Sequence, residues 1–192
     1  MEKTFQKEAS ISAILAGLSA LAYAYYFIIA KNTMLYGLFL ALSGLFALPV
    51  MVALFNKLKK VDEGFATLAL VLGAVGVIGT LVHGAYDLAN AINPPKMMNL
   101  DLPSQIDPRG LLAFGVMGLA IFKFSWLMTK DKYFPGGLVN WGYLSGTLLV
   151  VIYIARLTVL SPANPILLYP VLIEGFVVNP IWYIWLGLNL KK

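Results

Sequence analysis

The sequence predicts an all-α polytopic membrane protein, a bundle of six transmembrane helices with both termini in the cytoplasm. Hydrophobic residues make up 60% of the chain and charged residues only 12%, whereas charged residues make up about 25% of an ordinary soluble domain. In addition, six stretches approach or exceed the roughly 20 apolar residues that a membrane-spanning helix needs. We therefore expect a single transmembrane domain over residues 1–192, with the lipid bilayer as its main partner.

The spans follow one another with short connections, so sequential helices should be antiparallel neighbours. The longest connection, residues 93–109, contains Pro94, Pro95, Pro103 and Pro108. It is too rich in proline for a regular helix, and we expect it to form an external loop that caps the third and fourth helices. The predicted spans are residues 9–30, 33–55, 64–92, 110–129, 137–160 and 165–189.

The basic residues predict the orientation. The loops on one side of the predicted bundle and both termini carry nine Lys and Arg residues, while the loops on the other side carry Lys31, Lys96 and Arg109. Since the more basic side of a membrane protein faces the cytoplasm, both termini should lie there. The net charge of +5 resides at helix ends, so we do not expect nucleic acid as a partner.

Small residues recur at four-residue spacing in several spans, a pattern that lets helix backbones approach closely in lipid. We expect these positions to pack within the chain in preference to forming a dimer face. They are Ser12-Ala16-Ala20-Ala24, Ala69-Gly73, Gly76-Thr80-Gly84 and Gly142-Gly146.

Large aromatic residues stand near the ends of the predicted spans, where such side chains commonly lie at the level of the lipid headgroups. We therefore expect Trp126, Trp141, Trp182, Tyr183 and Trp185 to form interfacial belts.

Ionisable residues inside spans are costly in lipid and are candidates for function. Lys123 lies near the predicted cytoplasmic end of its helix, where its long side chain can reach water. The other four, His83, Asp87, Arg156 and Glu174, fall at a similar depth, nearer the outside. His83 and Asp87 share a helix face with Thr80 because they are four residues apart, and we expect Arg156 to pair with Asp87 or Glu174.

This cluster has two interpretations. It can be a buried polar staple that fixes three helices in register. It can also be an outward-opening pocket in which Arg156 receives an anionic or polar group while His83 and Asp87 relay a proton. Pro170 and Pro180 should disrupt the helix on either side of Glu174, so that Asn179 and freed carbonyls line a cavity.

The residue types present in the chain argue against most enzyme chemistry, and we expect no catalytic residues and no cofactor. The chain has no Cys and a single His, which excludes thiolate metal sites, a cysteine nucleophile and a bis-histidine haem. A metal site on His83, Asp87 and Glu174 has only generic spacing, so no metal is expected. The run Gly142 to Gly146 lacks the Gly-x-Ser-x-Gly spacing of a nucleophile elbow.

Three motifs resemble a known group. They are Asp107-Pro108-Arg109-Gly110-Leu111-Leu112, the Asn164-Pro165 turn, and the ending Asn179-Pro180-Ile181-Trp182-Tyr183-Ile184-Trp185-Leu186-Gly187. With these the chain resembles uncharacterised six-helix bacterial integral membrane proteins grouped under a domain of unknown function. The resemblance implies the bundle and a bacterial inner membrane, and it implies no activity.

Two functions follow as hypotheses. The first is binding or transport of a small polar or anionic molecule through His83, Asp87, Arg156, Glu174 and Asn179. The second is a non-catalytic accessory subunit that packs against a larger membrane complex, in which case the cluster is structural and partner subunits or a second copy cover the lipid-facing surfaces.

Overall fold

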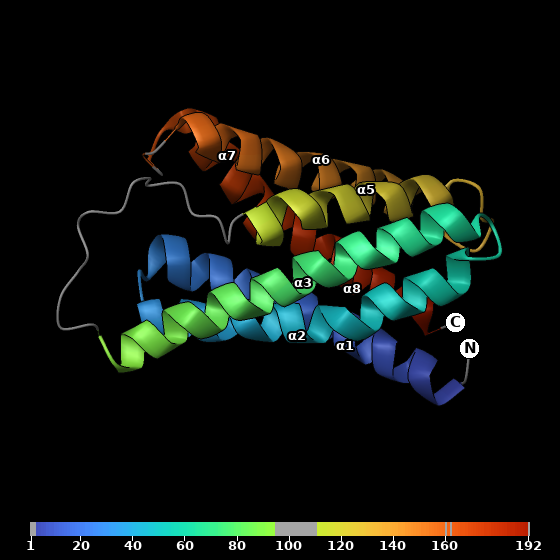
Figure 1. Cartoon of the computed structure of the whole chain (residues 1–192), viewed down its shortest axis with the longest axis horizontal. Helices are drawn as coiled ribbons and strands as arrows, with labels where there is room; N and C mark the ends of the chain where they lie inside the picture. The colour runs from blue at the N-terminus through green and yellow to red at the C-terminus, as the bar shows by residue number, and fades with distance from the viewer. Residues whose placement is uncertain (1–2, 95–110, 160, 162, 192) are drawn as a thin grey trace.

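Long helices lie side by side and build the whole of the described molecule (Figure 1). The structure is a computed structural model that describes residues 3–94, 111–159, 161 and 163–191. Most of the predicted external loop, residues 93–109, lies outside the described residues. Within these described residues the chain forms six helical rods: α1 (Lys3–Ala24) with the π-helical turn η1 (Tyr25–Ile29), α2 (Thr33–Leu58), α3 (Glu63–Ile92), η2 (Leu111–Val116) with α5 (Met117–Met128), α6 (Gly136–Thr158), and α7 (Pro165–Ile173) with η3 (Glu174–Val178) and α8 (Asn179–Leu190).

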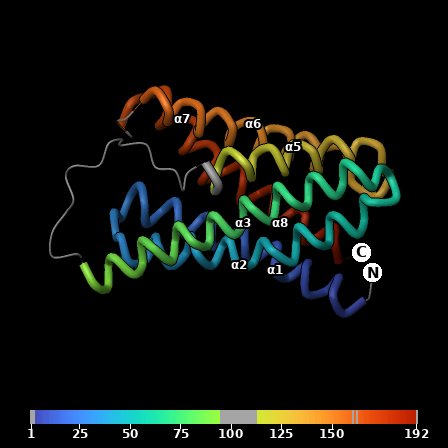
Figure 2. Tube along the Cα trace, in the orientation of Figure 1, coloured from blue at the N-terminus to red at the C-terminus, as the bar shows by residue number. Residues whose placement is uncertain are grey.

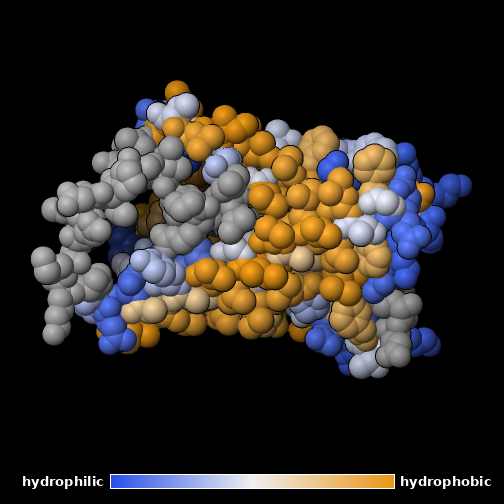
Figure 3. All heavy atoms as spheres, in the orientation of Figure 1, coloured by the Kyte–Doolittle hydropathy of each residue, from blue (hydrophilic) through white to orange (hydrophobic). Residues whose placement is uncertain are grey.

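Five of the rods are long and apolar enough to cross a membrane. The rod of η2 and α5 contains a shorter apolar helix, Ala113–Met128, and it begins where the described residues resume. Figure 3 shows an apolar belt around the middle of the visible face, with hydrophilic residues toward the ends. Large apolar side chains are exposed on α3, among them Val71, Ile78 and Val82. The protein is therefore an integral membrane protein with an all-helical fold.

Polar side chains explain where several helices begin. Asn32, Asp62 and Asn164 precede α2, α3 and α7, and each accepts a hydrogen bond of 3.0 Å from a backbone N–H of the first turn. Such caps satisfy amides that the helix leaves unpaired. The starts of α2, α3, α6 and α7 agree with the predicted spans to within a residue, whereas α1 begins at Lys3, six residues before the predicted apolar stretch.

Sequential rods pack as neighbours, as predicted: α2 lies between α1 and α3, and α5 lies between α3 and α6. The last rod returns to the first, because α8 packs on α1. There the Ser10 hydroxyl donates to the carbonyl of Gly187 and the Gln6 amide donates to the carbonyl of Leu190, both at 2.7 Å. Both ends of the chain consequently lie at one end of the bundle (Figure 2).

Glycines bring α2 and α3 into backbone contact. A Cβ added at Gly44 would lie 2.7 Å from the backbone nitrogen of Leu81, and one added at Gly84 would clash with the backbone of Ala41. Gly76 meets the backbone of Met117 in the same way, and Gly146 meets that of Gly118. The small-residue patterns at Gly76 to Gly84 and at Gly142 to Gly146 therefore pack within the chain, as expected.

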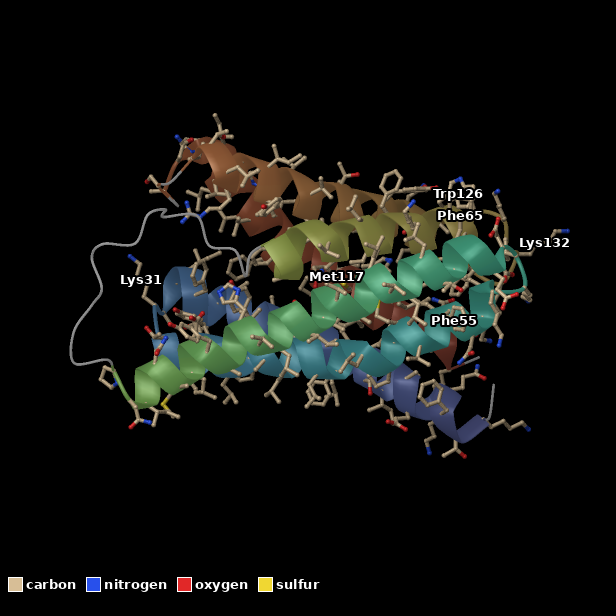
Figure 4. All side chains as sticks on the ribbon, in the orientation of Figure 1. Lys31, Phe55, Phe65, Met117, Trp126 and Lys132 are labelled. Carbon is tan, nitrogen blue, oxygen red and sulfur yellow. The ribbon has the colours of Figure 1, made fainter. Side chains whose placement is uncertain are left out.

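Basic residues gather at the end that holds the termini. Lys60 forms an ion pair of 3.5 Å with Asp131, and the ammonium of Lys130 lies 3.8 Å from the ring centroid of Trp126. Lys123 lies over the ring of Phe65, 5.4 Å from its centroid, and Phe65 is at this same end, whereas Lys31 is at the opposite end (Figure 4). Lys123 thus reaches the end predicted for it.

The belt prediction is wrong for two of its aromatic residues. Trp182 is fully buried and Tyr183 is 5% exposed, and their rings pack against each other with centroids 4.9 Å apart. The reason is that α8 packs against both α1 and α6, so these rings fill the interior. Trp126, Trp141 and Trp185 are partly buried against the core.

Candidate functional site

Glu174 opens an interruption in the last membrane-spanning rod. Here the helix widens into the π-helical turn η3, in which the N–H of Asn179 bonds the carbonyl of Glu174, five residues earlier. The sequence favours the change at this place because Pro180 follows directly, and a proline has no N–H to continue the ladder. Such single π-turns are common at functional sites.

The carboxylate of Glu174 is buried in the middle of the protein. The hydroxyl of Ser145 on α6 donates to its Oε1 at 2.6 Å, and the side-chain amide of Asn179 donates to the same oxygen at 3.1 Å. Its other oxygen, Oε2, is buried and has no hydrogen-bond partner. Only 4% of the residue is exposed, so one half of the carboxylate is compensated and the other half is not.

Glu174 lines a cavity of about 100 Å³ at the centre of the bundle. A buried water occupies roughly 10–15 Å³ of such volume, so the cavity has room for several waters or for a ligand of a few heavy atoms. Met117 lines the cavity, and it lies midway along the bundle (Figure 4). All six rods contribute to the wall, through Tyr23, Ser43, Thr80, Met117, Leu149 and Glu174.

The two aliphatic hydroxyl groups of the wall, those of Ser43 and Thr80, have their hydrogens engaged elsewhere. Thr80 donates to the carbonyl of Gly76 at 2.9 Å, and Ser43 donates to the carbonyl of Leu40 at 2.8 Å. A hydroxyl that donates its only hydrogen keeps lone pairs that can accept. The described residues that line the cavity include one carboxylate and no Lys, Arg or His.

His83 and Asp87 form the pair that their spacing predicted. His83 Nε2 lies 3.4 Å from Asp87 Oδ2, and the side chains are 11% and 15% exposed. They follow Thr80 on α3 by one and two turns, toward the end of the bundle away from the termini. Thr80 belongs to the cavity wall, while neither His83 nor Asp87 is among the described residues that line it.

Arg156 occupies the last turn of α6. Its Nη1 donates to the carbonyl of Val159 at 3.1 Å, and a cation is favourable at a helix C-terminus. The side-chain hydrogen bonds to the Glu174 carboxylate come from Ser145 and Asn179. The pairing of Arg156 with Glu174, one of the two expected, is therefore not formed. A pairing of Arg156 with Asp87 stays a prediction.

Sequence reasoning found Glu174 and Asn179, and it placed Thr80 on the face that leads to His83. It missed Ser145 as the partner of Glu174. Ser145 is fully buried, and the available signal was its position between Gly142 and Gly146 on a face that packs tightly.

Comparison of the chain with protein-family models, curated proteins and solved structures gives no match. The resemblance to six-helix bacterial membrane proteins therefore stays an expectation.

Proposed function

We propose that this protein binds a small polar molecule in the cavity beside Glu174 and carries it through the membrane. The observation that supports this most directly is the unpartnered Oε2 of Glu174, buried beside a cavity. Placing an ionisable side chain at the centre of a membrane helix costs about 2.5–3.5 kcal/mol. A staple alone would use both carboxylate oxygens, whereas a binding site leaves one for its ligand.

The interrupted rod favours transport over static binding. Broken helices at membrane depth occur where the backbone lines a cavity, and transporters bind substrates and coupling ions at such places. Here α7, η3 and α8 together span the length of the bundle, and the break falls at Glu174. A widened turn has fewer fixed hydrogen bonds than the regular helices around it, so it offers a position where the rod can bend.

The distribution of charge supports the orientation that we propose, with both termini in the cytoplasm of a bacterial inner membrane. Among the described residues, the end that holds the termini carries most of the lysines, and Lys31 lies at the other end. In this orientation the His83–Asp87 pair would lie on α3 one to two turns beyond Thr80 toward the external face, where it could relay a proton or meet an entering polar ligand. The residues at the terminal end are Lys3, Lys7, Lys57, Lys59, Lys60, Lys130, Lys132 and Lys191.

The absence of cysteine gives a clean test of access to the cavity. Ser43→Cys places a thiol in the cavity wall, and Ser125→Cys places one at a position of zero exposure outside that wall. In cells, silver ion added outside, which is small enough for a cavity of about 100 Å³ and does not cross lipid, should bind and so label the thiol of the first variant and leave that of the second unlabelled.

If Ser43→Cys also resists the reagent from both sides of the membrane, the cluster is a closed staple and the proposal fails. That result would favour the accessory-subunit hypothesis, which otherwise stays a prediction. Its own signature would be partners that co-purify after mild solubilisation.

A further inference from the structure

We propose that the ligand group that enters the cavity is a monovalent cation, which neutralises Glu174 by binding at Oε2. This inference rests on the proposed function and names the chemistry of that same site. An alkali metal ion and a small organic ammonium share this chemistry, and the experiment below distinguishes them.

The charge of the cavity wall is the first observation that favours a cation. Glu174 carries the one carboxylate among the described lining residues, and no basic side chain accompanies it there. An ionised carboxylate in a low-dielectric interior needs a compensating charge, because its isolated transfer from water is very unfavourable. An anionic ligand would add to the imbalance, whereas one positive charge would remove it.

The hydrogen-bonding character of the cavity wall is the second observation that favours a cation. The hydrogens of Ser43 and Thr80 point to backbone carbonyls, so the oxygens of both hydroxyls are available as acceptors toward the cavity. Ser145 likewise donates its hydrogen to Glu174. Hydroxyl and carboxylate oxygens are suitable ligands for alkali and ammonium cations.

The backbone of η3 provides the third observation that favours a cation. Asn179 N–H bonds the carbonyl of Glu174, and in the same register the N–H of residue 180 would bond the carbonyl of Gly175. Residue 180 is proline, so that donor does not exist. Gly175 lines the cavity beside Glu174, and carbonyls freed by unwound helices are known ligands for cations at membrane depth.

The size of the cavity limits which cations can bind. A volume of about 100 Å³ holds an alkali ion with a few waters, or methylammonium, and it excludes bulky organic cations. A bulky cation that the cavity excludes keeps the ionic strength constant without entering the site, so it serves as the control.

The test uses the full chain in nanodiscs of neutral phosphatidylcholine at constant ionic strength. N-methylglucamine chloride is replaced stepwise by sodium chloride, potassium chloride or methylammonium chloride, and the melting temperature is followed by tryptophan fluorescence. Because a ligand at 100 times its Kd stabilises the folded state, we expect a saturable rise of about 5 °C or more with at least one probe. A response to sodium or potassium alone identifies an alkali site, and a response to methylammonium alone identifies an organic ammonium site.

Three variants assign the response to the cavity. Glu174→Gln should abolish the dependence on the cation, and Thr80→Val should raise the half-saturating concentration about tenfold by removing one ligand oxygen. Glu63→Gln removes an exposed carboxylate at the start of α3 and should leave the response unchanged. If Glu174→Gln does not fold, Thr80→Val and Ser43→Ala carry the test.

The inference is overturned if no probe shifts the melting temperature, or if Glu174→Gln responds as the wild type does. It is also overturned if the melting temperature responds only to pH, since a proton alone would then neutralise Glu174, with Tyr23 and Tyr183 as the other titratable groups facing the cavity. Labelling of Ser43→Cys without a cation response would leave the proposed function standing and remove this inference. Absence of labelling would remove both.

Discussion

The hydroxyl of Ser145 donates to Oε1 of Glu174 across 2.6 Å, and this bond joins α6 to the π-helical turn of the last rod. Both residues are buried, at 0% and 4% exposure. The bond holds one carboxylate oxygen against α6 while Oε2 has no hydrogen-bond partner. The position of the carboxylate is therefore set by a neighbouring helix as well as by its own.

Replacing Ser145 with Ala should destabilise the protein, because Oε1 would keep only the longer bond from Asn179. Loss of a hydrogen bond to a buried carboxylate should lower the free energy of unfolding by about 1–3 kcal/mol. Thermal melting in nanodiscs measures the change, and Ser161→Ala, at an exposed position, is the matched control. Equal melting temperatures for the two variants would show that the bond contributes nothing.

Gly84→Ala and Gly64→Ala should shift stability in opposite directions. A Cβ at Gly84 collides with the backbone of Ala41, so α2 and α3 must separate, at a cost of about 1–3 kcal/mol. At Gly64 the nearest atom, Asp62 Oδ1, is 3.6 Å away, and alanine should add up to about 1 kcal/mol through helix propensity. If Gly84→Ala melts at or above the wild-type temperature, the backbone contact between α2 and α3 is not formed.

The helices could be predicted because their signal is local. Apolar runs of spanning length and capping residues such as Asn32 and Asp62 fix where rods begin, whatever their neighbours are. The site depends on which faces meet, and that is decided by packing. Ser145 and Glu174 are 29 residues apart in sequence, and no spacing rule connects them. Arg156 shows that a shared depth does not identify a partner. Its predicted depth matched that of Glu174, but Ser145 and Asn179 donate the hydrogen bonds to that carboxylate.

Trp182 should behave as a core residue and Trp126 as a residue near the end of the bundle. In variants that each retain a single tryptophan, brominated lipids should quench the fluorescence of Trp126 more strongly than that of Trp182, which has no exposed surface. Trp182→Phe should also lower the free energy of unfolding by about 1–3 kcal/mol through the space that it leaves. Trp185→Phe, at a partly buried position, should have a smaller effect. Strong quenching of Trp182 by lipid would restore the belt prediction for this residue.

Pro180→Ala should separate stability from function. The new N–H can bond a carbonyl of the preceding turn, so the rod should become more regular and the free energy of unfolding should stay equal or rise by about 1 kcal/mol. The same change supplies a donor for the carbonyl of Gly175, which is then no longer available to a cation, so labelling of Ser43→Cys and the cation-dependent melting shift should both decrease. Pro165→Ala, at the first turn of α7 where proline is well tolerated, should preserve both readouts. If Pro180→Ala keeps full labelling and the full cation response, the interruption at Glu174 is a packing feature and the cavity works without it.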